Sequence, residues 1–333
     1  SEKMAFNGFK KEAITFLKDL DKNNSKVWFE DHRHIWQKNI LEPNVDFVEE
    51  MGETLQILVP TIKAIPKASA SLFKIYRDTR FSKDKTPMKD KIGILSSNGF
   101  LLLKSFITND EVEEYLNRIN TYIDQICPQL PEEEVFYEVK NNPSSLKQLQ
   151  RMHLHDPWFS GLINGKVKQL AEILLKNEVI TKNLQYFNKP PNLGKATPPH
   201  QDGFYFKLDP PEALTMWLAL DDVDEENGCV RYVKGSHLKG IRDHSLTGTL
   251  GFSQGLTEYG TDDDIKNEVS VPAQKGDLIV HDSLTIHWAS KNLSKTRNRR
   301  ALGFIFYSAK SKENNLDIED YKKQLEVQQK GQI

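Results

Sequence analysis

The second half of the chain carries short apolar or alternating segments that are separated by turn signals. The strand-like segments are residues 184–188, 214–220, 230–233, 278–280 and 301–307. The turn signals between them are Pro190-Pro191, Pro210-Pro211, Glu226-Asn227-Gly228 and Lys275-Gly276-Asp277. Many short strands punctuated in this way favour an antiparallel double-sheet or barrel architecture.

Helical segments precede these strands. Thr108 and Glu111 have the spacing of a capping box, and one helical face then follows at Val112, Tyr115, Leu116, Ile119 and Ile123. A second helix fits residues 167–175, and residues 99–103 predict an opening strand. Residues from about 316 onward form a charged tail that predicts a surface helix. The expected fold is α+β: a double-stranded β-helix (a cupin-like jelly roll) with helical cover.

The first 94 residues predict a different kind of structure. Apolar residues recur at three- and four-residue steps from Phe9 to Leu20, which predicts an amphipathic helix. Ser25 follows a turn cluster and is the expected N-cap of a second helix. A third helix is expected at residues 45–58 and a strand at residues 71–76. We therefore expect two domains, a small and mostly helical module at residues 1–94 and a jelly-roll domain at residues 95–333.

Composition limits the setting and the partners. Lys and Arg number 45 against 47 Asp and Glu, so the formal net charge of −2 indicates no general attraction to nucleic acid or anionic membrane. The locally basic stretch at residues 74–91 is expected to be a solvated surface. No apolar run reaches the roughly 18 residues of a membrane span, and the first residues lack the apolar core of a signal peptide. With only two cysteines, Cys127 and Cys229, we expect a protein of the reducing cytoplasm.

His200-Gln201-Asp202 places an imidazole and a carboxylate two positions apart. On a strand or its exit loop the two side chains face the same side, so they can bind one cation. His287 is the best candidate for a third ligand, because a turn and a buried strand are expected just before it. Two histidines and one carboxylate leave coordination positions open, as non-haem Fe(II) requires. The alternative is that His200 lies in a turn and Asp202 caps a bend, without any metal.

Two adjacent arginines precede the last predicted strand. A guanidinium on a barrel strand can bind a carboxylate through two parallel hydrogen bonds, as the distal carboxylate of 2-oxoglutarate requires. Each arginine taken alone is more typical of a surface. Together with the three candidate ligands, however, Arg299 favours a site for iron and 2-oxoglutarate, and Arg300 is the alternative.

Residues 97–307 resemble the phytanoyl-CoA dioxygenase family of Fe(II)- and 2-oxoglutarate-dependent oxygenases. The matching strings are Asn98-Gly99-Phe100, His155-Asp156-Pro157-Trp158-Phe159, Asn188-Lys189-Pro190-Pro191, Pro199-His200-Gln201-Asp202, Trp217-Leu218-Ala219-Leu220-Asp221-Asp222, Glu226-Asn227-Gly228-Cys229, Gly235-Ser236-His237 and Arg299-Arg300-Ala301. The resemblance implies that the iron ligands are His200, Asp202 and His287. It also implies that Arg299 binds the far carboxylate of 2-oxoglutarate and that Gln185 and Trp217 line the cosubstrate pocket.

Two positions depart from the family pattern. The interval from His287 to the arginine is one residue longer than usual, which keeps Arg300 open as a substitute. Ala289 stands where the family often has a serine, so one hydrogen bond to the cosubstrate is expected to be missing.

The first module resembles the front part of a widespread bacterial and fungal family without an established function. The resemblance is carried by Asn23-Asn24, Trp28-Phe29 and Ile75-Tyr76-Arg77-Asp78-Thr79-Arg80-Phe81-Ser82-Lys83-Asp84-Lys85-Thr86-Pro87. That family's domain is normally longer, and here it is expected to stop around residue 94. Two origins are consistent with this, a natural fusion with a shortened module and an artificial join.

The implied activity is that of an Fe(II)- and 2-oxoglutarate-dependent dioxygenase. Such an enzyme hydroxylates an unactivated C–H bond of a small molecule with O₂ and releases succinate and CO₂. Because Asp202 supplies a carboxylate ligand and leaves no position for a halide, hydroxylation is favoured over halogenation. The alternative class is a non-catalytic jelly roll that binds a ligand or partner, and the intact set of four groups favours the enzyme.

Several other chemically attractive residues are expected to be structural. They are His153 and His155 in a turn, His237 closing a turn, His281 packing within its strand, and Cys229 as a small buried hydrophobe. The residues that flank the candidate ligands, and that fit either a pocket wall or core packing, are Phe204, Tyr205, Phe206 and Trp288. The loop at residues 240–267 is expected to shape the substrate pocket.

Overall fold

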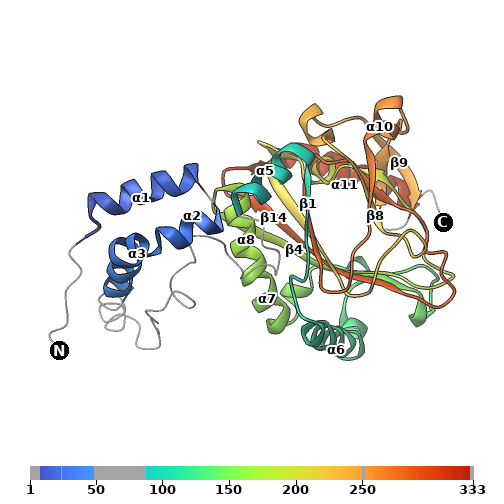
Figure 1. Cartoon of the computed structure of the whole chain (residues 1–333). Helices are drawn as coiled ribbons and strands as arrows, with labels where there is room; N and C mark the ends of the chain where they lie inside the picture. Colours follow the sequence, from blue (N-terminus) through green and yellow to red (C-terminus); the bar gives the residue numbers. More distant parts are fainter. Residues whose placement is uncertain (1–7, 24, 49–87, 250–251, 331–333) are drawn as a thin grey trace. The chain divides into compact units, whose positions relative to one another are not determined.

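The computed structural model describes residues 8–23, 25–48, 88–249 and 252–330, and the chain divides into two compact units (Figure 1). Of the described residues, the smaller unit takes in those up to 48 and Met88, and the larger one takes in those from Lys89 onward. The larger unit begins a few residues before the expected boundary at 95, because helix α5 (Met88–Asn98) leads directly into strand β1 (Phe100–Leu103). The division into residues 1–94 and 95–333 stays a prediction.

The smaller unit is helical, as the sequence predicts. Its elements are α1 (Lys11–Lys22), α2 (Lys26–Asp31), α3 (Arg33–Trp36) and the π-helical η1 (Gln37–Leu41), after which residues 42–48 are helical. The expected cap is present, because the Ser25 side chain accepts a hydrogen bond from the Trp28 backbone N–H. Its buried core consists of Ala13, Phe16, Leu20, Phe29 and Ile40.

Some predictions for the first module lie outside the described residues. They are the strand at 71–76, the family-like string at 75–87, most of the basic stretch at 74–91, and the part of the helix at 45–58 that follows residue 48.

The larger unit contains two main antiparallel sheets. The seven-stranded sheet has the order β1-β12-β7-β14-β4-β3-β2, and the four-stranded sheet has the order β11-β8-β13-β5. The remaining strands of the first sheet are β2 (Val135–Tyr137), β3 (Leu146–Leu149), β4 (Val179–Lys189), β7 (Ala213–Ala219), β12 (Leu278–Asp282) and β14 (Arg299–Ser308). The strands of the second are β5 (Thr197–His200), β8 (Val230–Val233), β11 (Glu268–Val271) and β13 (His287–Ala289).

Two further strand pairs complete the unit. They are β9 (His244–Thr249) with β10 (Phe252–Leu256), and β6 (Leu208–Asp209) with β15 (Lys312–Glu313). All five strand segments predicted in the second half of the chain are present, and so is the opening strand predicted at residues 99–103.

The core lies between the two sheets. Its buried members come from both of them: Trp217, Ala219, Val223, Cys229, Val230, Tyr232, Val271, Ala273, Ile279 and Ala301. Apolar side chains that interdigitate between two antiparallel sheets are the defining feature of this layered architecture. The predicted α+β jelly roll with helical cover is therefore confirmed.

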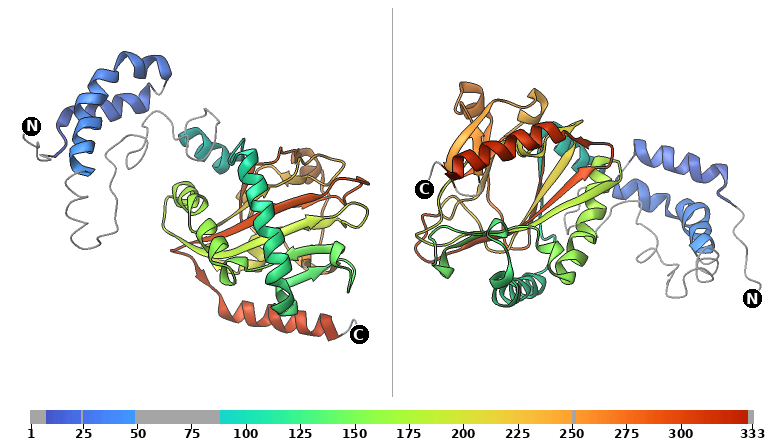
Figure 2. Two further views of the ribbon diagram at one scale, coloured as in Figure 1. Left: turned by 90° about the horizontal axis from the view of Figure 1, so that it is seen from below. Right: turned by 180° about the vertical axis from the view of Figure 1, so that it is seen from behind.

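Helices cover the outer face of the larger sheet, as Figure 2 shows from below and from behind. The α-helices of this unit after α5 are α6 (Asn109–Gln125), α7 (Pro157–Ile163), α8 (Lys166–Leu175), α9 (Asp202–Phe206), α10 (Asp262–Asn267) and α11 (Asn315–Lys330). Helix α8 contacts β4 and β14, and α6 packs on α7 through the Tyr122 and Phe159 rings, whose centroids lie 5.6 Å apart. The capping box of Thr108 and Glu111 begins α6 as predicted, although Tyr122 rather than Ile123 completes its buried face.

Short 3₁₀ turns connect these elements. They are η2 (Cys127–Gln129), η3 (Glu132–Glu134), η4 (Pro143–Ser145), η5 (Met152–Leu154) and η6 (Ser236–Lys239). At the entry to β12, Gly276 has φ +92°, and a Cβ there would lie 2.6 Å from the Ile107 carbonyl oxygen. The turn into this buried strand therefore needs glycine. None of the helices in the described part of the chain is both long enough and apolar enough to traverse a bilayer.

Candidate metal and cosubstrate site

Strand pairing brings the three candidate ligands together. His200 is the last residue of β5 and His287 the first of β13, and these two residues are direct partners in the antiparallel register. Asp202 follows at the start of α9. Residues far apart in the sequence thus meet at one edge of the four-stranded sheet, facing the space between the sheets.

The donor atoms converge on one point. The Nε2 atoms of His200 and His287 lie 3.3 Å and 3.4 Å from the same oxygen, Oδ1 of Asp202. One ligand atom from each of the three residues lies within 4.8 Å of the others. Both imidazoles are buried, with His200 3% exposed and His287 8% exposed. Two imidazole nitrogens and one carboxylate oxygen at this spacing surround a volume that fits a divalent transition-metal ion.

Backbone carbonyls orient both imidazoles. The Nδ1–H of His200 donates to the Pro198 carbonyl at 2.8 Å, and that of His287 donates to the Thr285 carbonyl at 2.9 Å. A donated Nδ1–H fixes the tautomer in which Nε2 carries the lone pair, and this is how metal-binding histidines are commonly held. Each ring therefore directs Nε2 toward Asp202.

The ionisation states also suit metal binding. Burial lowers the pKa of His287 well below its ordinary value, which keeps the imidazole neutral. Burial alone would raise the pKa of Asp202, but attraction to His287 and polar contacts with His200 and His281 outweigh it, so the pKa lies well below its ordinary value. A neutral imidazole and an ionised carboxylate are the forms that bind metal.

The second carboxylate oxygen of Asp202 has its own partners. Its Oδ2 accepts hydrogen bonds from the Thr215 hydroxyl at 2.7 Å and from Nε2 of His281 at 2.8 Å. The expectation that His281 only packs within its strand is therefore wrong. Its ring does lie in β12 and is buried, but it contacts the candidate metal centre directly. A histidine within an otherwise apolar buried strand is the sequence signal that could have indicated this role.

A cavity of about 320 Å³ opens beside the three candidate ligands. Arg299, Gln185 and Trp217 all line it, as the sequence resemblance implies. Arg299 is 5% exposed, its Nη1 donates to the Gly228 carbonyl at 3.0 Å, and its guanidinium lies over the Trp217 ring at 5.3 Å. Among the residues that the structure describes, none accepts a hydrogen bond from the buried Arg299 Nε. An incompletely satisfied buried guanidinium in a cavity is suited to an anionic guest.

Arg300 points away from this cavity. Its Nε and Nη2 donate to the two carboxylate oxygens of Asp221, at 3.0 Å and 2.7 Å. Adjacent residues of one strand face opposite sides, so only one of the two arginines can reach the cavity. The structure places Arg299 there.

Two lysines that the sequence analysis did not single out also line the cavity, Lys147 and Lys189. The register of β3 against β2 shifts at Lys147, a β-bulge that lets Lys147 and Gln148 face the same cavity. Burial lowers the pKa of all three basic groups. The pKa of Lys147 is lowered, that of Lys189 is lowered more strongly, and that of Arg299 is lowered to about 10. Lys147 pairs with Glu138 at 3.3 Å, and Nζ of Lys189 donates to the Lys195 and Ser290 carbonyls, so of these three groups Arg299 is the one with an N–H that no described residue accepts.

Aromatic side chains form much of the remaining wall. Tyr205, Phe206 and Trp288 line the cavity, whereas Phe204 stacks on His244 with ring centroids 4.2 Å apart. The described residues of the loop at 240–267 do not line this cavity, so the expectation that this loop shapes it directly is wrong for them. The loop instead supports a wall residue, because the Trp288 indole N–H donates to Tyr259 and to Glu268.

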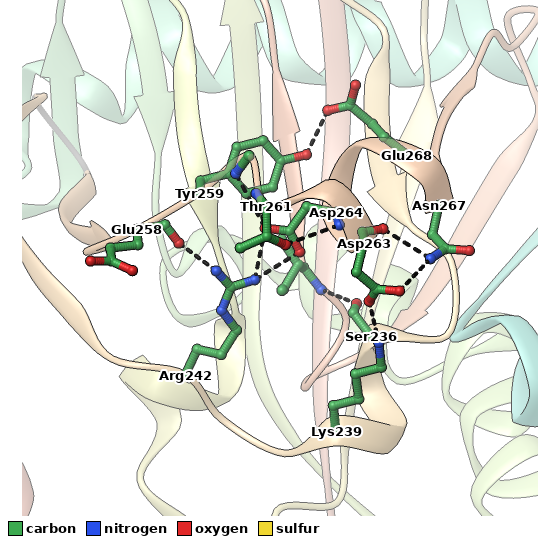
Figure 3. A network of polar contacts seen from close by, with 12 residues as sticks. Ser236, Lys239, Arg242, Glu258, Tyr259, Thr261, Asp263, Asp264, Asn267 and Glu268 are labelled. Carbon is green, nitrogen blue, oxygen red and sulfur yellow. Dashed lines mark hydrogen bonds and ion pairs between the residues drawn. The ribbon is translucent and has the colours of Figure 1, made fainter.

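A polar network holds this loop against the rest of the unit (Figure 3). In that view the Arg242 guanidinium bonds the Asp264 carboxylate, at 2.8 Å and 2.9 Å, and also the Glu258 carbonyl. Tyr259 donates to Glu268 at 2.6 Å, and Lys239 pairs with Asp263.

The same loop is anchored next to the candidate ligands. Gln201, which stands between His200 and Asp202, is fully buried, and its side chain bonds the Gly240 and Leu284 carbonyls and the Arg242 backbone N–H. The Gln201 backbone N–H donates to Nε2 of His244 at 3.0 Å. Burial lowers the pKa of His244 to about 4, so the ring stays neutral and can accept this bond.

The residues expected to be structural have the following contacts. His153 accepts from the Leu184 backbone, His155 follows the 3₁₀ turn η5, and Asp156 caps α7. His237 bonds the Ser96 carbonyl, and Cys229 is buried in the core. No second cluster of potential metal ligands occurs among the residues that the structure describes.

Comparison with known proteins gives two family matches. Residues 95–301 match the model of a family described as "Phytanoyl-CoA dioxygenase (PhyH)". Residues 12–115 match one described as "Conserved hypothetical protein (DUF2461)". These are the two resemblances seen in the sequence. The second match extends to residue 115, beyond the expected end near residue 94, so the two matched segments overlap at residues 95–115.

Individual proteins agree with the first match. A protein from Arabidopsis thaliana named phytanoyl-CoA dioxygenase is 26% identical over 252 residues, covering 65% of this chain and 88% of its own. The solved structure of the epimerase SnoN in complex with Fe³⁺, alpha ketoglutarate and nogalamycin RO is 22% identical, with a TM-score of 0.55 and coverage of 68% and 86%. That of EvdO2 from Micromonospora carbonacea var. aurantiaca, complexed with 2-oxoglutarate, is 23% identical, with a TM-score of 0.54 and coverage of 68% and 92%. At these identities the two structures show a shared fold.

Proposed function

The chain belongs to the phytanoyl-CoA dioxygenase family of Fe(II)- and 2-oxoglutarate-dependent oxygenases, and we propose that it hydroxylates an unactivated C–H bond of a small molecule. The co-reactant is O₂, and the products besides the alcohol are succinate and CO₂. One observation carries this proposal: the convergence of His200, Asp202 and His287 beside a cavity that also contains Arg299.

In this proposal the three converging residues bind Fe(II). Two imidazoles and one carboxylate would hold the ion and would leave it able to bind a cosubstrate and oxygen as well. The bound iron supplies the oxidising chemistry, and the protein supplies orientation and a site closed to bulk water. The backbone carbonyls of Pro198 and Thr285 accept from the Nδ1–H groups of the two imidazoles and so keep both Nε2 atoms directed toward Asp202.

Arg299 is the proposed ligand of the distal 2-oxoglutarate carboxylate. Its buried guanidinium lines the cavity and retains an N–H that none of the described residues accepts. Gln185 and Trp217 are proposed to flank the cosubstrate. The Trp217 ring lies under the Arg299 guanidinium, which is the group proposed to bind the cosubstrate. Ala289 lines the same cavity and has no hydroxyl, so it adds no hydrogen bond there.

Hydroxylation is preferred to halogenation because Asp202 supplies a carboxylate. A carboxylate ligand takes the coordination position that a halide would need. The small-molecule substrate is supported by the size of the cavity, about 320 Å³, which falls in the range of small ligand sites. The non-catalytic alternative would not need the oriented ligand set, and no contact in the site favours it.

We also propose a cytoplasmic setting. Both cysteines, Cys127 and Cys229, are free and buried, which is typical of proteins in a reducing compartment.

The test uses the full-length protein without oxygen. Fe(II) and 2-oxoglutarate added together should give the weak visible charge-transfer band of the metal chelate, and His200→Ala and His287→Ala should lose it. His34→Ala, at an exposed position in the smaller unit, is the matched control and should retain the band. A folded wild-type protein that gives no band, or a His200→Ala variant that binds iron unchanged, would show that the proposal is wrong.

A further inference from the structure

His281 has contacts that a buried strand residue does not need for packing. It is the fourth residue of β12, after three apolar buried residues, and is itself 3% exposed. Its Nε2 lies 2.8 Å from Oδ2 of Asp202, and its Nδ1 lies 2.7 Å from the Tyr232 hydroxyl. Both ring nitrogens are therefore occupied by polar partners inside the protein.

The two oxygens of Asp202 have separate roles. Oδ1 faces the Nε2 atoms of His200 and His287, whereas Oδ2 accepts from Thr215 and His281. Thr215 and His281 are direct cross-strand partners on β7 and β12, so the strand register presents both donors to one oxygen. Two donors on Oδ2 prevent the carboxylate from rotating to offer both oxygens to an ion.

The direction of the hydrogen bonds is set by Tyr232. Its ring is fully buried and stacks on Phe100, with centroids 4.6 Å apart. The Tyr232 hydroxyl carries a proton and lies 2.7 Å from Nδ1 of His281, so it can donate to that nitrogen. When the hydroxyl donates to Nδ1, the His281 proton lies on Nε2 and is donated to Asp202.

This chain of contacts also joins the two sheets. Tyr232 lies on β8 of the four-stranded sheet, and His281 lies on β12 of the seven-stranded sheet. Asp202 is attached to neither strand, since it begins the short helix α9. The carboxylate is therefore positioned by side chains from both sheets rather than by its own backbone alone.

We propose that His281 is a positioning residue that holds Asp202 to one-oxygen coordination of the metal ion. This inference rests on the proposed function, because it takes His200, Asp202 and His287 as the metal ligands. One-oxygen coordination keeps the remaining positions available to the cosubstrate and to oxygen. The outer partners of metal ligands commonly contribute about 10- to 100-fold to metal affinity.

The experiment measures binding of Co(II), a spectroscopic substitute for Fe(II), to the full-length protein without 2-oxoglutarate. His281→Leu removes both hydrogen bonds and should weaken Co(II) binding about 10- to 100-fold. His281→Gln keeps an N–H donor at the ε position and should recover most of that loss. Tyr232→Phe removes only the outer contact and should give a smaller loss, with the visible Co(II) spectrum shifted toward that of His281→Leu.

The outcomes separate this inference from the proposed function. If wild type and all three variants bind Co(II) equally well with the same spectrum, while His287→Ala does not bind, His281 has no positioning role. A different pair of results would show that His281 is itself a metal ligand. In that case His281→Gln would lose as much Co(II) affinity as His287→Ala. The NMR spectrum of Co(II)-bound His281→Gln would also lack one metal-shifted imidazole N–H signal that the wild type shows. If wild type itself does not bind the metal, the proposed function fails. Should His281→Leu not fold, the comparison of His281→Gln with Tyr232→Phe still decides the matter.

Discussion

Arg300 and Asp221 form a two-point ion pair on the outer side of β14, with Nε–Oδ2 and Nη2–Oδ1 distances of 3.0 Å and 2.7 Å. This pair satisfies one of two adjacent arginines and leaves the other, Arg299, as the guanidinium in the cavity. The contrast between the two positions makes their proposed roles directly testable.

Replacing Arg299 with Ala should weaken 2-oxoglutarate binding about 10- to 100-fold, because a charge-assisted hydrogen bond in a buried site contributes roughly 1.5–3 kcal/mol. Iron binding should change little, since Arg299 is not among the three converging ligands. Anaerobic titration of the chelate band with 2-oxoglutarate measures the cosubstrate affinity of each protein.

Arg300→Ala is the matched control for this prediction. It should leave 2-oxoglutarate affinity within about twofold and lower the free energy of unfolding by about 1 kcal/mol or less, because the ion pair with Asp221 is partly exposed. Equal loss of cosubstrate affinity in the two variants would show that the assignment of Arg299 is incorrect.

Gln201→Leu should destabilise the protein by about 3 kcal/mol. The change leaves the Gly240 and Leu284 carbonyls and the Arg242 N–H without their buried partner, and each such group costs roughly 1–3 kcal/mol. The loop at residues 240–267 should also become more susceptible to proteolysis. Urea unfolding and limited proteolysis measure the two effects.

Gln129→Leu provides the comparison, because Gln129 is exposed on η2. Its free energy of unfolding should stay within about 0.5 kcal/mol of the wild-type value. The anchoring role of Gln201 is refuted if both variants lose the same small amount and the loop is cleaved at the wild-type rate.

The half-buried His244 should make the protein sensitive to mild acid. Its folded-state pKa is about 4, below the unfolded value of 6.5, so the unfolded chain takes up a proton over this range while the folded protein does not. Stability is therefore complete above pH 6.5 and falls as the pH decreases toward 4. These two pKa values correspond to a loss of about 2 kcal/mol between pH 7 and pH 5. Because the side chain is partly exposed, we expect the wild type to lose about 1 kcal/mol more than His244→Gln.

Urea unfolding of the metal-free proteins at a series of pH values checks this prediction. All other titrating groups are common to both proteins, so the difference isolates position 244. Parallel stability profiles for wild type and His244→Gln would contradict it.

The fold was largely predictable because its signals are local. Alternating or apolar runs identified β4, β7, β8, β12 and β14, and the Thr108 capping box located the start of α6. The pairing of β5 with β13 has no local signal, since the strands are distant in sequence and short. Only the three candidate ligands, at the strand ends, indicated that these segments meet.

The site residues could be predicted where their chemistry depends on spacing along the sequence. They could not be predicted where their direction depends on how two strands pair. His200-x-Asp202 stands out in the sequence, but which of Arg299 and Arg300 faces inward depends on the pairing of β14 with β4 and β7. Likewise, His281 resembles a packing residue until the β7–β12 register places it opposite Thr215. Lys147 enters the cavity through a β-bulge, a backbone irregularity that residue type does not reveal.

The most direct test of the central claim is the fate of molecular oxygen. Full-length protein incubated with Fe(II), 2-oxoglutarate and ¹⁸O₂ should form succinate that contains one ¹⁸O atom, even if slowly without substrate, and Asp202→Ala should form none. Folded wild-type protein that binds both Fe(II) and 2-oxoglutarate but produces no labelled succinate above the Asp202→Ala background would contradict the account.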